Sequence, residues 1–122
     1  MKKMAIMTSL IAWLLFCCTS VAAQSDYYMR QARSYQREAE YYTKQAQGYD
    51  REVAYYNRQA QSALREAEYY SKRENYDRVK SYQHRAKDAT DKAESYKRKA
   101  DYARDRARSY MRKAEEALRK AK

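Results

Sequence analysis

Pairs of adjacent tyrosines recur every fourteen residues, and this repeat constrains the fold of the chain more than any other feature. Self-alignment gives four copies, which begin at Tyr27, Tyr41, Tyr55 and Tyr69. Fourteen residues are two heptads, and the heptad is the period of a coiled coil. The chain also has no proline and one glycine, so it lacks the turn residues that multi-layered sheets and mixed α/β domains require. The repeat therefore predicts an all-α protein built as an extended coiled coil with Ala/Tyr heptads.

Alanine and tyrosine alternate at spacings of four and three residues and form two heptad stripes. The first stripe holds the residues that we expect to pack and self-associate: Tyr28, Ala32, Tyr35, Ala39, Tyr42, Ala46, Tyr49, Tyr56 and Tyr70. The second stripe runs from Val79 to Ala121 and has fewer tyrosines. Alanine lets helices approach closely, and a tyrosine ring covers the neighbouring helix. Helix packing is thus the favoured role of the tyrosines, while oxidative cross-linking and cation–π adhesion stay open as alternatives.

The heptad phase is lost between the two stripes. Tyr70 and Tyr82 are 12 residues apart, which is neither a multiple of seven nor the spacing that one stutter leaves. Residues 24–70 form a Tyr-rich arm and residues 79–122 a basic, Ala-rich arm of similar length. Matched arms favour an antiparallel helical hairpin that turns within residues 71–78. That segment has no glycine or proline, so a single long helix remains the alternative.

Residues 1–23 have the features of a cleaved secretory signal peptide. Two lysines precede a mostly apolar run that ends at Phe16, and small residues lead to a cleavage site after Ala23. The run is shorter than the ~20 residues that a membrane-spanning helix needs. Acylation at Cys17 or Cys18 is disfavoured, because no small residue precedes either cysteine. The sequence therefore predicts a secreted or periplasmic protein, exported by a bacterium, with a mature chain that has no thiol.

Positive charge gathers in the second half of the chain. The whole chain has a formal charge of +11; residues 24–75 contribute +1 and residues 76–122 contribute +8. The basic residues that we expect to bind polyanions are Lys97, Arg98, Lys99, Arg104, Arg106, Arg108, Arg112 and Lys113. For an exported protein the available polyanions are anionic lipid, lipopolysaccharide, polysaccharide and extracellular DNA. A solvated helix face with surplus basic residues explains the same excess equally well.

Residue patterns typical of enzymes do not occur in this sequence. His84 is the one histidine, and there is neither an H-x-x-x-H motif nor a Gly-rich phosphate loop. Glu38 and Glu40 are two residues apart, so they face different directions on a helix. We therefore expect no catalytic residues, no metal site, no cofactor and no small-molecule substrate.

The Ala-rich heptads, the predicted export signal and the terminal Lys122 resemble the architecture of bacterial murein lipoprotein, an envelope helix attached to peptidoglycan through a C-terminal lysine. Tyrosine here replaces the aliphatic interface residues of that family, so the resemblance is limited to architecture. We expect an exported, non-enzymatic coiled-coil protein that forms homo-oligomers as a structural or adhesive component of the cell envelope or extracellular matrix. The alternative is a cationic, chaperone-like binding module, periplasmic or secreted, for polyanions or anionic lipid.

Overall fold

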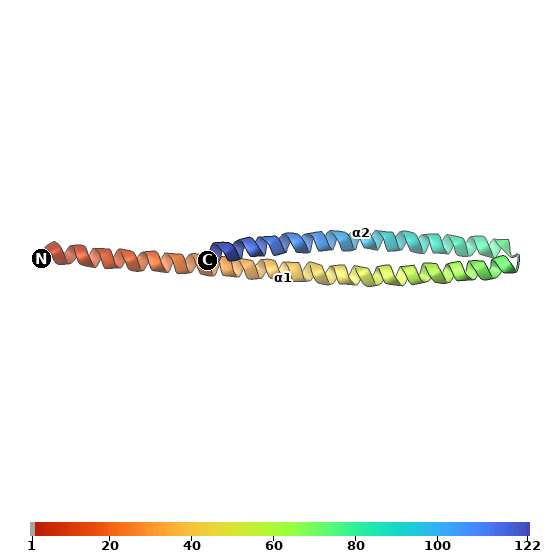
Figure 1. Ribbon diagram of the computed structural model, residues 1–122, viewed down its shortest axis with the longest axis horizontal. Helices are drawn as coiled ribbons and strands as arrows, with labels where there is room; N and C mark the ends of the chain where they lie inside the picture. Colours follow the sequence, from red (N-terminus) through yellow and green to blue (C-terminus); the bar gives the residue numbers. More distant parts are fainter. Residues whose placement is uncertain (1) are drawn as a thin grey trace. The chain divides into compact units, whose positions relative to one another are not determined.

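The chain is all-α, as the repeat predicts. The computed structural model describes the backbone of residues 2–122 and the side chains of residues 22–122. Helix α1 spans Lys2–Lys72 and helix α2 spans Tyr76–Ala121, and no strand occurs in the described residues (Figure 1). The side chains of the predicted apolar signal segment, with Cys17 and Cys18, lie outside the described ones.

The helices contribute to two compact units. The turn unit comprises Glu40–Ala107, and the end unit combines the residues up to Ala39 with Arg108–Lys122. Within the turn unit, α1 and α2 run antiparallel and are joined by a short connection (Figure 1). Within the end unit, the Ser25 hydroxyl of α1 donates a hydrogen bond of 2.9 Å to the Ala121 carbonyl at the end of α2. The chain thus folds as a helical hairpin and not as a single long helix.

Three residues connect the helices without a glycine or proline. The Asn75 N–H donates to the Tyr70 carbonyl at 3.0 Å, and the Glu74 N–H donates to the Ser71 carbonyl at 3.1 Å. These two bonds form a Schellman motif, in which Glu74 takes the left-handed conformation with a φ of 60°. The Asn75 side chain then accepts the Arg78 N–H at 3.4 Å and caps α2. Two adjacent residues therefore end one helix and begin the next.

Alanine forms the core of both units. Among residues 22–122, fourteen apolar residues are buried, and all belong to the two predicted stripes: Ala32, Ala39, Ala46, Ala60, Ala63, Ala67, Ala86, Ala89, Ala93, Ala100, Ala103, Ala107, Ala114 and Ala117. The tyrosines of the stripes are half-buried, and no large side chain is fully buried among residues 22–122. Each buried alanine removes one methyl group from water, which contributes about 0.8 kcal/mol. The core therefore buries little apolar surface for the number of residues that fold around it.

Candidate functional site

The second ring of each tyrosine pair packs between the helices. In the turn unit, Tyr70 stacks on Tyr82 with ring centres 5.6 Å apart, and Tyr56 stacks on Tyr96 at 5.7 Å. The ring planes of both pairs are within 10° of parallel, so the rings hold α1 against α2 by their faces. The predicted self-association residues all lie on this buried or half-buried side of α1: Tyr28, Ala32, Tyr35, Ala39, Tyr42, Ala46, Tyr49, Tyr56 and Tyr70. They pack within one chain, and their role between chains stays a prediction.

A basic residue of α2 lies over a tyrosine ring in every heptad. These seven residues, the α2 cation row, are Arg78, Arg85, Lys92, Lys99, Arg106, Lys113 and Lys120. In the turn unit, for example, Lys92 Nζ is 5.4 Å from the ring centre of Tyr56, and Arg106 Cζ is 5.6 Å from that of Tyr42. A cation over a ring contributes about 0.5–1 kcal/mol at an exposed site. Net charge alone does not reveal this row, although its strict seven-residue spacing is visible in the sequence.

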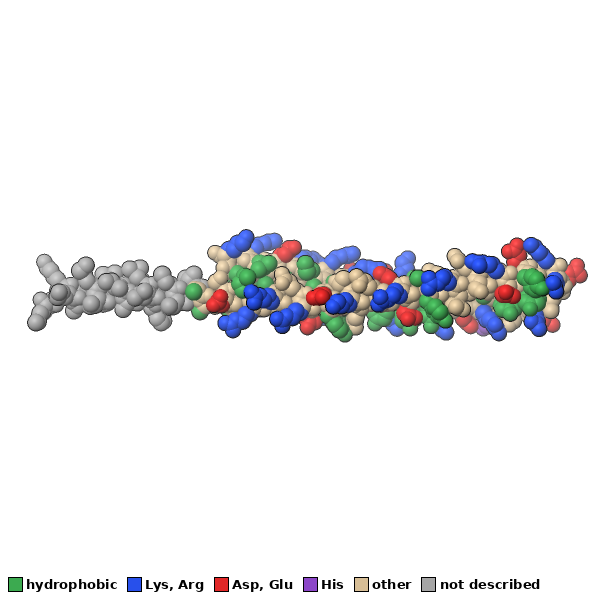
Figure 2. All heavy atoms as spheres, turned by 90° about the horizontal axis from the view of Figure 1, so that it is seen from below, with side chains coloured by type: hydrophobic (Ala, Val, Ile, Leu, Met, Phe, Trp, Pro, Cys, Tyr) green, Lys and Arg blue, Asp and Glu red, His purple; other side chains and the backbone are tan. Residues whose placement is uncertain are grey.

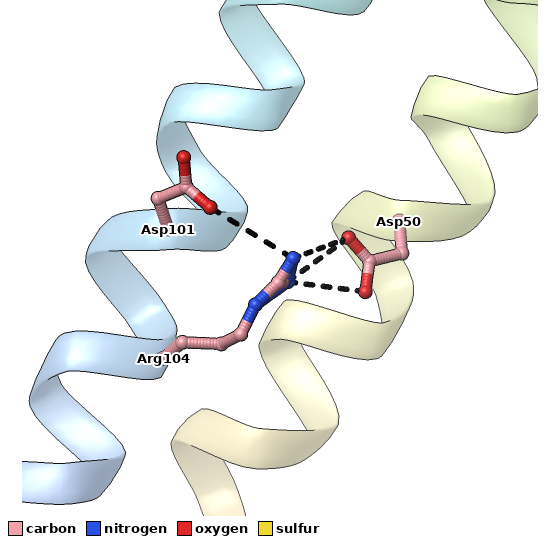
Figure 3. Close-up of polar contacts among 3 residues, drawn as sticks. All are labelled: Asp50, Asp101 and Arg104. Carbon is pink, nitrogen blue, oxygen red and sulfur yellow. Dashed lines mark hydrogen bonds and ion pairs between the residues drawn. The ribbon is translucent and has the colours of Figure 1, made fainter.

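The eight basic residues predicted to bind polyanions do not form one surface. Three belong to the α2 cation row: Lys99, Arg106 and Lys113. Arg104 instead extends toward α1, where its guanidinium donates to both Asp50 carboxylate oxygens at 3.0–3.1 Å, and it lies 3.9 Å from Asp101 (Figure 3). The other four are exposed at several positions around α2: Lys97, Arg98, Arg108 and Arg112. Figure 2 likewise shows Lys and Arg side chains spread over the drawn face.

The first ring of each tyrosine pair faces solvent. Tyr41, Tyr55 and Tyr69 in the turn unit are 55%, 48% and 46% exposed, and Tyr27 in the end unit is 60% exposed. We call these four the outer tyrosines. Each meets the ring of the following tyrosine edge-on, with ring centres 5.1–5.3 Å apart. Successive side chains on a helix are about 100° apart, so only one ring of a pair reaches α2.

A groove of about 510 Å³ lies in the turn unit where the repeat loses a tyrosine. Ala63 takes the position that Tyr49 holds one copy earlier. Ala63 lies midway between Tyr56 and Tyr70 on α1, and Ala89 lies midway between their stacking partners on α2. Neither helix therefore supplies a ring between the two stacked pairs. Both alanines line the groove, together with Tyr56 and Tyr82. The groove is therefore a gap in the ladder of rings.

Potential metal ligands do not cluster in the described part of the chain. No group of three His, Cys, Asp or Glu side chains gathers there, and His84 is exposed and lies 3.6 Å from Asp88. Between residues 22 and 122, whose side chains the structure describes, neither helix has a stretch that is long and apolar enough to cross a membrane. No protein-family model, curated protein or solved structure matches the chain. The tyrosine and cation surfaces are thus the features from which function can be inferred.

Proposed function

We propose that this chain is an exported, non-catalytic coiled-coil protein whose hairpins self-associate to form a structural or adhesive element of a cell envelope or extracellular matrix. The outer tyrosines carry the proposal. Their rings protrude from α1 at every second heptad, and about half of each ring-bearing side chain remains in contact with water. An exposed aromatic ring with a polar tip is well suited to a contact between proteins.

The thin core supports the same proposal. Its buried residues are alanines, so folding of one chain removes little apolar surface from water. Contacts with further chains would bury the outer rings as well and would stabilise the folded state by mass action. Stability of the hairpin should then rise with protein concentration.

Light scattering coupled to size exclusion, over a wide concentration range, tests self-association. We expect oligomers from the parent chain, and we expect Tyr41→Ser/Tyr55→Ser/Tyr69→Ser to weaken association by about tenfold or more. The matched control is Gln47→Ser/Ala54→Ser/Gln61→Ser, which changes three other exposed positions of α1 and should associate like the parent. A parent chain that stays monomeric at every concentration would refute the proposal.

A second candidate function is polyanion binding, and the charge of residues 76–122 favours it. These residues carry +8, and most of their basic side chains are exposed. Anionic lipid, lipopolysaccharide, acidic polysaccharide and extracellular DNA are the polyanions that an exported protein would meet. Binding of this kind should weaken steeply as salt concentration rises, which a titration at low and at physiological salt would detect.

A further inference from the structure

A basic residue occupies every seventh position of α1 throughout the turn unit. These residues, the α1 cation row, are Lys44, Arg51, Arg58, Arg65 and Lys72. Residues one heptad apart share a face of a coiled-coil helix, and they are about 10.5 Å apart along its axis at 1.5 Å per residue. All five side chains are exposed. The row therefore presents cations at regular steps on the face of α1 that points away from α2.

Most of this row is free to meet an anion. Lys44 lies 3.2 Å from Glu40, and Lys72 lies 3.7 Å from Glu68, but all four side chains are well exposed, so these ion pairs are weak. The three arginines between them, Arg51, Arg58 and Arg65, form no ion pair with the residues that the structure describes. The middle of the row is thus unneutralised.

The outer tyrosines lie between the cations of the row. Tyr55 comes four residues after Arg51 and three before Arg58, and Tyr69 stands in the same relation to Arg65 and Lys72. Side chains three and four residues apart are neighbours on a helix surface. Each exposed ring is therefore flanked by two cations of the row, and this arrangement recurs every fourteen residues, or about 21 Å. Tyr69 also has the Arg73 guanidinium over one face, 4.4 Å from its ring centre, which leaves its other face for a ligand.

We propose that this face of α1 binds a linear acidic polysaccharide that carries one carboxylate or sulfate group per disaccharide. The distance between successive anionic groups along such a polysaccharide is comparable to the distance between successive cations of the α1 cation row. The apolar face of a pyranose ring can stack on an exposed tyrosine, while the flanking arginines pair with the anionic groups. The proposal rests on the second proposed function and places its site on α1, in the half of the chain whose net charge is close to zero.

Other occupants fit this face less well. Successive phosphates of a single nucleic-acid strand lie closer together than the cations, so the row would neutralise only some of them. Insertion into a lipid surface needs several large apolar side chains, and Leu64 is the one exposed large aliphatic residue between positions 40 and 72. A second copy that packs on the outer tyrosines would have to offset its own α1 cation row from this one, because two rows in register repel each other. Self-association and the polysaccharide would therefore compete for the outer tyrosines.

Fluorescence anisotropy with the full chain tests the proposal. The probes are a labelled hyaluronan oligosaccharide, an oligothymidylate with the same number of charges, and vesicles that contain phosphatidylglycerol. We expect hyaluronan to bind most tightly at equal charge and Arg51→Gln/Arg58→Gln/Arg65→Gln to weaken its binding by about tenfold at low salt. Tyr55→Ala/Tyr69→Ala should also weaken binding but leave its salt dependence unchanged, because no charge is removed.

The matched control removes the same charge from exposed positions of α2. Lys80→Gln/Lys87→Gln/Arg119→Gln should weaken binding by no more than about threefold, through the change in net charge alone. Equal losses in the two triple variants, or tighter binding of oligothymidylate or vesicles than of hyaluronan, would overturn the proposed site while leaving polyanion binding intact. Absence of binding to all three probes would refute both the site and the second proposed function. Circular dichroism of each variant checks that the helices are retained.

Discussion

Tyr55 and Tyr56 carry the same side chain at adjacent positions but have different environments. Tyr55 is 48% exposed, whereas the ring of Tyr56 stacks on Tyr96 and lies under Lys92. The cause is the step of about 100° per residue of an α-helix, which turns one ring toward α2 and the other toward solvent. The pairs of the repeat thus supply two kinds of surface from one residue type.

This difference should appear as a difference in stability between two single substitutions. Tyr56→Ala should lower the free energy of unfolding by about 2 kcal/mol, because it removes a half-buried ring together with its stacking contact to Tyr96. Tyr55→Ala should change it by less than about 0.5 kcal/mol in the single chain. Urea unfolding followed by circular dichroism, at low protein concentration, measures both values. Equal losses would mean that the assignment of inner and outer rings is wrong.

Gly48 lowers the stability of α1, because a glycine inside a helix is less favourable than an alanine. It lies within α1, and a Cβ atom placed there would approach only Arg51 Nη2, at 3.9 Å. Gly48→Ala should therefore raise the free energy of unfolding by about 1 kcal/mol. The reverse change at an exposed alanine of the same helix, Ala54→Gly, is the control and should lower it by a similar amount. A destabilising Gly48→Ala would show that the glycine has a structural role that this packing does not include.

At the scale of the helices, the heptad stripes predicted the packing face closely. The buried alanines and half-buried tyrosines lie on the stripes that the four-and-three spacing defines. The matched arms favoured a hairpin over one long helix, but the sequence left the second open, because the usual turn residues are missing. Glu74 adopts the left-handed conformation that glycine normally takes, and Asn75 contributes to both helix ends.

The strained turn residue gives a prediction about the connection. A left-handed conformation costs an L-residue about 1–2 kcal/mol, so Glu74→Gly should raise the free energy of unfolding by about 1 kcal/mol. The control, Gln61→Gly, places a glycine at an exposed position inside α1 and should lower it by about 1 kcal/mol. Thermal and urea melts of the two variants would decide. If both variants lose stability alike, residues 73–75 do not form this turn.

The gap in the ladder of rings gives a prediction about packing between the helices. Ala63→Tyr restores the residue of the first two repeat copies and adds a ring where the groove lies. We expect it to raise the free energy of unfolding by about 1 kcal/mol through added apolar burial. Ala60→Tyr, on the close-packed alanine side, should instead lower it by about 1–3 kcal/mol through overpacking. A loss of stability in Ala63→Tyr as large as that in Ala60→Tyr would contradict this packing of the two helices in the turn unit.

At the scale of the whole molecule, the net charge of each half does not show where exposed cations are located. Residues 24–75 have a net charge of +1, so net charge predicts a polyanion surface only in α2. Glu40 and Glu68 pair with the two ends of the α1 cation row, but no described acidic residue forms an ion pair with its three central arginines. Conversely, three of the eight predicted α2 residues lie over tyrosine rings, and Arg104 pairs with Asp50. Counting charge by heptad position would have found both rows.

Residue-resolved nitration of the tyrosines tests most directly the division into packed and exposed rings. Mass spectrometry can report the extent of reaction at each member of the pairs in the turn unit. At low protein concentration, we expect Tyr41, Tyr55 and Tyr69 to react several times faster than the tyrosines that follow them, because reactivity depends on exposure of the ring. At high concentration, the three outer tyrosines should become protected as the chains associate. Equal reaction of both members of each pair at low concentration would contradict the packing of the hairpin, and unchanged reactivity at high concentration would contradict association through the outer rings.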